Sequence, residues 1–271
     1  MRFLNRHPGR SGQWLLTLLP FLILALLYAF GSATRLADNP NDKLLPSLAQ
    51  MVDAVRHMAF MEDPRTGDYL FWSDTLASLQ RVLLGLGIAA VAGLVLGIAN
   101  GIFPVLRAGF SPLLTVISMV PPLAILPILF IVMGLDELSK VMLIVIGVTP
   151  LLARDLEHTG RAIPAELLIK AQTLGANSWT VVLRVALPQM LARLLVSLRL
   201  SLGAAWLFLI SAEAISATAG LGYRIFLVRR YLAMDVILPY VVWITLLAWL
   251  MDWLLRAVHR RFFPWAEGGR A

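Results

Sequence analysis

The stretch Val82–Phe103, VLLGLGIAAVAGLVLGIANGIF, runs for 22 residues without a charged side chain. About 20 apolar helical residues span the roughly 30 Å hydrocarbon core of a bilayer. Small residues recur there at every fourth position: Gly85, Ala89, Gly93, Gly97 and Gly101. In lipid, such a face lets helix backbones approach closely. We therefore expect a spanning helix whose small-residue face packs against another helix of the same chain, with a dimer contact as the alternative.

The rest of the chain has the same character. Of its 271 residues, 59% are hydrophobic and 14% are charged, whereas soluble domains average about 45–50% apolar and about 25% charged. The first apolar run is longer than the core of a signal peptide and is interpreted as a retained span. The sequence predicts an all-α membrane protein with about six spans: Gln13–Ala33, Val82–Phe103, a proline-interrupted Leu113–Met133, Ser139–Ala153 extended into Leu135–Leu138, Leu194–Thr218 and Val236–Val258.

The charge pattern indicates the topology. The net charge is +7, and Lys and Arg concentrate in alternate connecting segments and in both termini, as the positive-inside rule requires. We expect a multi-pass protein of a bacterial inner membrane with both termini in the cytoplasm, and no nucleic-acid partner. Three outer arginines, Arg224, Arg229 and Arg230, depart from the pattern. The absence of cysteine excludes disulfides and thiolate metal sites, and no metal site is expected.

The outer segment Arg35–Gln80 contains two predicted helices. In Pro46–Met58 the apolar residues recur at helical spacing. This helix either lies along the membrane surface or packs on the outer ends of the spans. Phe71–Gln80 is interpreted as a second short amphipathic helix that leads into the second span.

Prolines and charges inside the spans are candidates for the translocation path. Broken helices at membrane depth occur where backbone is buried or lines a cavity, so Pro121 and Pro122 either border the path or form a structural kink. Arg199 and Glu213 share the fifth span but lie about 21 Å apart along it, too far to pair. Each is assigned a structural role, Arg199 by snorkelling and Glu213 by binding a partner helix, with a place on the path as the alternative.

The predicted inner loop, Arg154–Leu191, contains a first short helix. Pro164 suits a first helical turn, Ala165–Leu174 contains good helix formers, and Gly175 is placed to end the helix. Glu166 and Lys170, four residues apart, form either a local ion pair or a contact with a partner protein.

A second short helix is predicted at Trp179–Leu187. Asn177 or Ser178 can cap it, and Pro188 is expected to mark a turn toward the next span.

This loop resembles the loop signature of binding-protein-dependent ABC importer permeases. The signature has Glu-Ala-Ala, three residues, glycine, nine residues and then Ile-x-Leu-Pro. Here Ile169–Gly175, IKAQTLG, is followed after nine residues by Val185–Pro188, VALP. Ala171, Gly175, Leu187 and Pro188 keep the pattern, whereas Ile169 and Lys170 replace the usual glutamate and alanine, so the contact made by that glutamate is not carried over.

Other motifs are similar to the nitrate, sulfonate and taurine branch of these permeases. They are Met119–Pro127, Gly134–Lys140, Ser197–Leu200, Ala212–Glu213 and Gly220–Tyr223, and the resemblance covers Ser73–Arg256. It implies the type I ABC importer permease fold. It also implies a second permease copy, a cytoplasmic ABC ATPase dimer that binds ATP and Mg, and an external substrate-binding protein.

The resemblance implies that the inner loop is a coupling helix seated on the ATPase. The expected coupling residues are Glu166, Ile169, Lys170, Ala171, Gly175, Leu187 and Pro188, and the candidate path residues are Pro121, Pro122, Arg199 and Glu213. The expected organisation is an N-terminal region with the outer segment (1–80), a permease core (81–258) with the coupling loop (154–191), and a cytoplasmic tail (259–271).

The expected function is import of a small polar or anionic solute, such as a sulfonate, nitrate or a related nitrogen compound. The chain has no Gly-x-x-x-x-Gly-Lys-Ser/Thr phosphate loop, so we expect no enzymatic activity and no cofactor of its own. An ion-gradient-driven secondary transporter is the alternative, although neither repeated halves nor a clear midplane ionisable site is recognised.

Overall fold

The structure is a computed structural model that describes residues 9–39, 42–64 and 67–266. All regular elements in these ranges are helices, which confirms the predicted all-α class. The chain forms two compact units. The first comprises Met1–Tyr69 with Val228–Pro239, and the second comprises Leu70–Leu227 with Tyr240–Ala271.

The first unit contains α1 (Arg10–Asp38), α2 (Leu48–Phe60), the 3₁₀ turn η2 (Arg229–Tyr231) and the start of α11 (Met234–Phe262). The helix predicted in the outer segment is confirmed as α2. It begins at a capping box, in which Ser47 Oγ accepts from the N–H of Gln50 while the Gln50 side chain accepts from the N–H of Ser47. Tyr28 on α1 donates to the carbonyl of Pro46 at 2.7 Å, which ties the preceding loop to α1.

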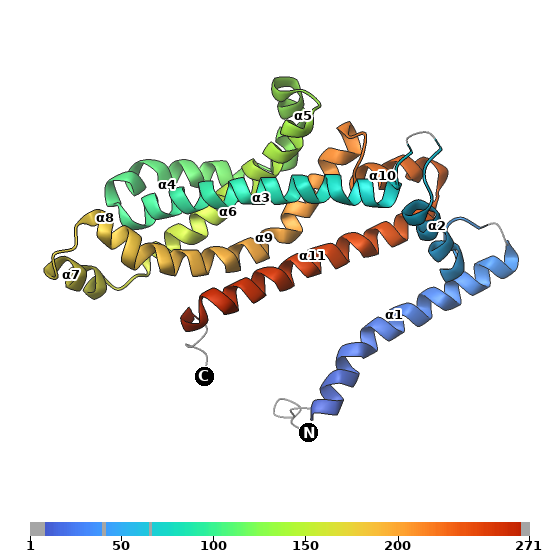
Figure 1. Cartoon of the computed structure of the whole chain (residues 1–271), viewed down its shortest axis with the longest axis horizontal. Helices are drawn as coiled ribbons and strands as arrows, with labels where there is room; N and C mark the ends of the chain where they lie inside the picture. Colours follow the sequence, from blue (N-terminus) through green and yellow to red (C-terminus); the bar gives the residue numbers. More distant parts are fainter. Residues whose placement is uncertain (1–8, 40–41, 65–66, 267–271) are drawn as a thin grey trace. The chain divides into compact units, whose positions relative to one another are not determined.

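The second unit is built on three helices that lie side by side (Figure 1): α3 (Leu70–Ile102), α6 (Glu137–Arg161) and α9 (Leu187–Ser216). The small-residue face of α3 packs against α6, as predicted. A β-carbon added to Gly85 would lie 2.8 Å from Ile144 Cβ, and one added to Gly93 would lie 2.7 Å from Leu152 Cβ. Both distances are shorter than ordinary contact, so this seam requires glycine.

The residues Phe71–Gln80 are helical and lead into the second span, as predicted, but they are the first turns of the continuous helix α3 and not a short helix of their own. No proline or glycine stands between Leu70 and Leu84 to end the helix. Four polar residues of its first turns are buried in the unit: Asp74, Thr75, Ser78 and Arg81.

The predicted third span is two helices. α4 (Pro104–Met119) and α5 (Pro122–Met133) meet at a bend of 95°. Pro121 has no N–H to continue α4, and its ring disfavours helical backbone at the preceding residue. Val120 is accordingly extended, with φ −73° and ψ 123°, whereas Pro122 opens α5 at a position where proline is well tolerated.

Two helices extend into the predicted inner loop. α6 continues to Arg161. After α7 (Ala165–Thr173), α8 (Ser178–Val181) and the π-helical turn η1 (Val182–Ala186) run directly into α9. The expected turn at Pro188 was wrong. The wide π turn, closed by the N–H of Leu187 bonding to the carbonyl of Val182, admits the proline ring without ending the helix.

Within the described residues, four helical stretches are long and apolar enough to cross a membrane: Gly12–Asp38, Leu70–Ile102, Ser178–Ser216 and Met234–Phe262. The bent pair α4–α5 adds a fifth if it counts as one span. α6 is not among these helices. Its uncharged stretch, Val141–Ala153, is short, and charged residues flank it on both sides.

Candidate coupling surface and buried charge clusters

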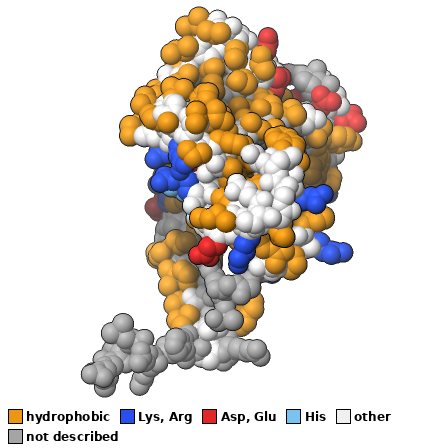
Figure 2. All heavy atoms as spheres, turned by 90° about the vertical axis from the view of Figure 1, so that its left-hand side faces the viewer, with side chains coloured by type: hydrophobic (Ala, Val, Ile, Leu, Met, Phe, Trp, Pro, Cys, Tyr) orange, Lys and Arg blue, Asp and Glu red, His pale blue; other side chains and the backbone are white. Residues whose placement is uncertain are grey.

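The helix α7 lies at the surface of the second unit. None of its residues is buried, and Ile169 is 57% exposed. Leu174, directly after it, is 88% exposed, and Trp179 on α8 is 67% exposed. Figure 2 faces this end of the unit and shows hydrophobic side chains at the surface beside Lys and Arg. We call Ile169, Leu174 and Trp179 the exposed patch. Exposed apolar side chains with charged neighbours are typical of a protein interaction site.

The backbone at Gly175 gives α7 a sharp end. Gly175 has φ +86°, a conformation that costs glycine little. Its N–H donates to the carbonyl of Gln172 at 2.9 Å, and the N–H of Ala176 donates to the carbonyl of Ala171 at 3.0 Å. These two bonds form a Schellman motif. The predicted helix end is confirmed, although Pro164 is the N-cap and not a first-turn residue.

The sequence left the cap of the second helix open between Asn177 and Ser178. The structure selects Asn177, whose Oδ1 accepts from the N–H of Thr180 at 2.8 Å. The exposed patch therefore lies on two helix ends held by local hydrogen bonds.

The structure brings most of the predicted coupling residues to this surface. Glu166, Ile169, Lys170 and Gly175 are exposed, whereas Ala171, Leu187 and Pro188 are half-buried. Leu187 and Pro188 begin α9, outside the exposed patch. None of the ion pairs found among the described residues joins Glu166 to Lys170.

Sequence reasoning missed Leu174 and Trp179 as members of the patch. Their signal was the presence of large apolar side chains in the most polar inner segment.

Glu213 is the centre of a buried cluster that joins α9 to α3. It has no exposed surface. Its carboxylate accepts from Arg81 Nη1 at 2.6 Å, from Ser78 Oγ at 2.8 Å and from the N–H of Gly222 at 2.8 Å. Arg81 also donates through Nη2 to Glu137 at 2.7 Å, which adds the start of α6. The predicted role of Glu213 in binding a partner helix is the one that this geometry supports.

A second cluster is centred on Asp74, which is also fully buried. Arg224 Nε donates to it at 2.7 Å, the N–H of Gly220 at 2.9 Å and the hydroxyl of Tyr240 at 3.1 Å. Arg224 is one of the three outer arginines that departed from the predicted charge pattern. Its ion pair with the buried Asp74 explains why an arginine lies at this position. Together the clusters attach the segment between α9 and α10 (Leu221–Val228) to α3.

Arg199 and Arg193 lie in the first half of α9 and bind aspartates of neighbouring helices. Arg199 Nε donates to Asp252 on α11 at 2.7 Å, so Arg199 has a protein partner in place of the expected snorkelling. Arg193 binds Asp155 on α6 in a bidentate pair, at 2.7 and 2.6 Å. Pro121 and Pro122 lie elsewhere, at the α4–α5 bend.

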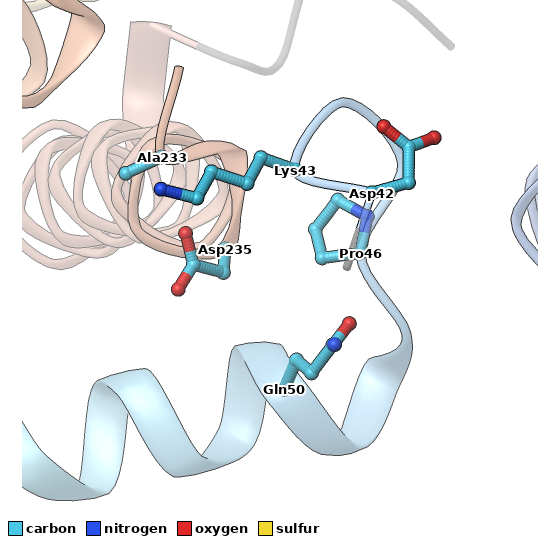
Figure 3. A pocket seen from close by; sticks show the side chains of 6 residues that line it. All are labelled: Asp42, Lys43, Pro46, Gln50, Ala233 and Asp235. Carbon is cyan, nitrogen blue, oxygen red and sulfur yellow. The ribbon is translucent and has the colours of Figure 1, made fainter. Parts of the chain in front are cut away.

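In the first unit, a small pocket lies between the loop before α2 and the start of α11, lined by Asp42, Lys43, Pro46, Gln50, Ala233 and Asp235. The side chain of Lys43 extends toward Asp235, whereas Asp42 points away (Figure 3). The N–H of Leu44 and the guanidinium of Arg35 hold the pKa of the Asp42 carboxyl below its ordinary value. Sequence reasoning did not single out this pocket.

No group of three or more His, Cys, Asp or Glu side chains in the described part of the chain is arranged to hold a metal ion.

Residues 89–264 match the family described as "binding-protein-dependent transport system inner membrane component". The taurine transport system permease protein TauC of Escherichia coli is 36% identical over 73% of this chain and 72% of its own length. The putative aliphatic sulfonates transport permease protein SsuC of Bacillus subtilis is 27% identical over 96% and 91%. The bicarbonate transport system permease protein CmpB of Synechococcus elongatus is 31% identical over 88% and 87%.

The fold is similar to that of a chain in an inward-facing structure of the MetNI methionine ABC transporter. The TM-score is 0.63 at 19% identity, over 74% of this chain and 99% of that chain. This likeness supports the predicted type I importer permease fold.

Proposed function

Because the chain belongs to the family of binding-protein-dependent transport system inner-membrane components, we propose that it carries a small polar or anionic solute inward, driven by a separate ATPase. It is a multi-pass inner-membrane permease subunit of an ABC importer. The proposed solute is a small polar or anionic compound, such as a sulfonate, nitrate or a related nitrogen compound. This class is favoured by relatives whose names specify taurine, aliphatic sulfonates and bicarbonate.

The exposed apolar patch on α7 and α8 is the observation that carries the proposed coupling. Leu174 and Trp179 have most of their surface exposed at the polar end of a membrane unit, where apolar side chains are stabilised by a partner protein. The partner is the cytoplasmic ABC ATPase dimer, which binds ATP and Mg. Enzymatic activity belongs to that partner, since this chain has no phosphate loop.

The remaining assembly consists of a second permease copy and an external substrate-binding protein. Both termini lie in the cytoplasm. This orientation follows from the inner excess of Lys and Arg and puts α7 on the side of the ATPase.

The continuous helix Ser178–Ser216 provides the route by which movement at the coupling surface reaches the membrane. No loop separates α8 from α9, so a displacement of α8, which carries Trp179, moves α9 with it. The far end of α9 is fixed to α3 through Glu213 and Arg81. α3 and α6 therefore move with α9, and the rigid-body movement changes the central path from inward-open to outward-open.

Pro121 and Pro122 border that path. The extended backbone at Val120 and Pro121 interrupts the helix, and such breaks at membrane depth line cavities or are buried in protein. Arg199 and Glu213 act structurally, through Asp252 and Arg81.

Reconstitution into vesicles tests this function. The chain is combined with its ATPase and binding protein, and uptake of labelled sulfonate is followed with and without ATP, and with ionophores that collapse ion gradients. Uptake that needs ATP and survives the ionophores supports the proposal. Uptake by this chain alone, abolished by the ionophores, would identify a secondary transporter and overturn it.

A further inference from the structure

The helix α2 of the first unit has a groove of about 640 Å³ on its apolar side. The groove is lined by apolar side chains of α2, by Pro239 near the start of α11 and by the cation Arg56. We propose that α2 lies in the boundary between the headgroups and the acyl chains of the bilayer, and that phospholipid acyl chains fill this groove.

The two sides of α2 differ in polarity. Leu48, Val52 and Phe60 line the groove with exposed side chains, and Val52 is 64% exposed. Asp53 and His57 are also exposed but do not line the groove. A helix with one apolar side and one polar side is typical of the membrane interface, where its apolar side enters the headgroup and acyl boundary by about 5–10 Å.

Hydrogen bonds to α1 fix the level at which α2 begins. The carbonyl of Pro46, two residues before α2, accepts from the hydroxyl of Tyr28 at 2.7 Å and from Ser32 Oγ at 3.1 Å. Both donors lie in the uncharged stretch of α1 that ends before Arg35. Since a helix rises about 1.5 Å per residue, Tyr28 lies about 10 Å before Arg35 along α1. α2 therefore begins beside the last apolar turns of a candidate span.

The surroundings at this level favour lipid as the occupant of the groove. The apolar side chains of α1 are exposed along the helix, as in a span that faces acyl chains. α2 crosses the direction of α1 (Figure 1), so it runs along the bilayer plane when α1 spans the bilayer.

Arg56 suits the same placement. The stem of a long cationic side chain packs on apolar surface while its charged head reaches the phosphates. Of the two positions that the sequence left open for this helix, the proposal selects the membrane surface.

Spin labels on single cysteines test this placement. The chain has no cysteine of its own. It is labelled, assembled with its partner subunits and placed in phospholipid nanodiscs. A label at Val52→Cys is expected to collide with oxygen, which concentrates among acyl chains, several-fold more often than with a water-soluble nickel chelate. Leu48→Cys, one turn earlier on the same side, should give the same result.

His57→Cys is the matched control, because this residue is exposed on the same helix and lies outside the groove. A label there should prefer the nickel chelate. A label at position 52 that prefers the chelate would place the groove in water, and a label that neither reagent reaches would place it against protein. Either result would overturn the proposal.

Addition of the external substrate-binding protein separates a lipid-filled groove from a docking site. Oxygen collisions at position 52 that persist in an excess of that protein support the proposal. Their loss on its addition would assign the groove to the binding protein instead. The result depends neither on the solute nor on the coupling surface, since it requires only that α1 spans the bilayer.

Discussion

Arg81 Nη1 donates to Glu213 Oε1 across 2.6 Å and joins α3 to α9 at a point where Glu213 has no exposed surface. The two residues are separated by 132 positions in the chain. Isolated charges inside membrane segments are costly, and pairing within the protein lowers that cost. This contact, together with Ser78 and the N–H of Gly222, attaches the far end of α9 to α3, as the proposed coupling movement requires.

Removing the arginine should destabilise the second unit strongly. In Arg81→Ala the Glu213 carboxylate stays buried without its cation, a change that costs about 3–5 kcal/mol when one partner of a buried pair is lost. We expect a clearly lower melting temperature in detergent and little folded protein. The double variant Arg81→Met with Glu213→Gln should recover part of the loss.

Arg230→Ala is the control, because it removes an exposed arginine and should leave the melting temperature nearly unchanged. Equal melting of Arg81→Ala and wild type would contradict the assigned role of the pair.

A single methyl group added at the contact between α3 and α6 should lower the stability of the protein. In Gly93→Ala the new β-carbon would lie 2.7 Å from Leu152 Cβ, and such overpacking costs about 1–3 kcal/mol. Gly87 is on the same helix with nothing within 4 Å of an added β-carbon. Gly87→Ala should therefore melt at or slightly above the wild-type temperature. A pair of variants with the same melting temperature would show that the seam is looser than the structure indicates.

Substitution of Gly175 should separate insertion from coupling. Gly175→Asp adds a charge to the coupling surface and strains a backbone at φ +86°, a cost of roughly 1–3 kcal/mol for a non-glycine residue. We expect normal membrane insertion, with ATP-driven uptake reduced at least tenfold. Gly175→Asn places a side chain of the same size on the left-handed backbone without adding a charge, and should keep most of the uptake. If a correctly assembled Gly175→Asp importer transports normally, the loop role is refuted.

Substitution by glutamate should affect ATPase docking differently at two exposed positions of the patch. Ile169→Glu restores the residue that is usual in the loop signature and should preserve ATPase docking. Leu174→Glu places a charge where the exposed side chain is apolar and 88% accessible, and should weaken co-purification of the ATPase several-fold. Both chains should fold, because neither side chain is buried. Loss of docking in Ile169→Glu alone would show that this interface is built around an apolar residue there.

The sequence was sufficient for features that depend on near neighbours. The four-residue spacing of glycines in α3 predicted a packing face, and Gly175 predicted the end of α7, because each depends on residues within a turn or two. The same local reasoning failed at Pro188, because the π turn of Val182–Ala186 lets the helix continue through the proline. It also failed at Pro121, where periodicity alone could not give a bend of 95°.

The buried clusters could not be predicted because their members are distant in sequence. Asp74 and Arg224 are 150 residues apart, and Arg81 carries no sign in the sequence that it faces Glu213. Arg224 counted as an outer charge in the topology pattern, whereas the structure pairs it with the buried Asp74. Only the packing of α3 against α9 and the start of α10 supplies this information.

Site-specific crosslinking tests the coupling role of α7 most directly, and the absence of cysteine in the chain makes the natural protein a ready background. Ile169→Cys, in a functional importer, is expected to crosslink to a cysteine placed in the cleft of the ATPase, with a yield that changes on ATP binding. Leu44→Cys, at an exposed position in the first unit, should give no such product. An importer that transports normally while the cysteine at position 169 never crosslinks to the ATPase would contradict the account.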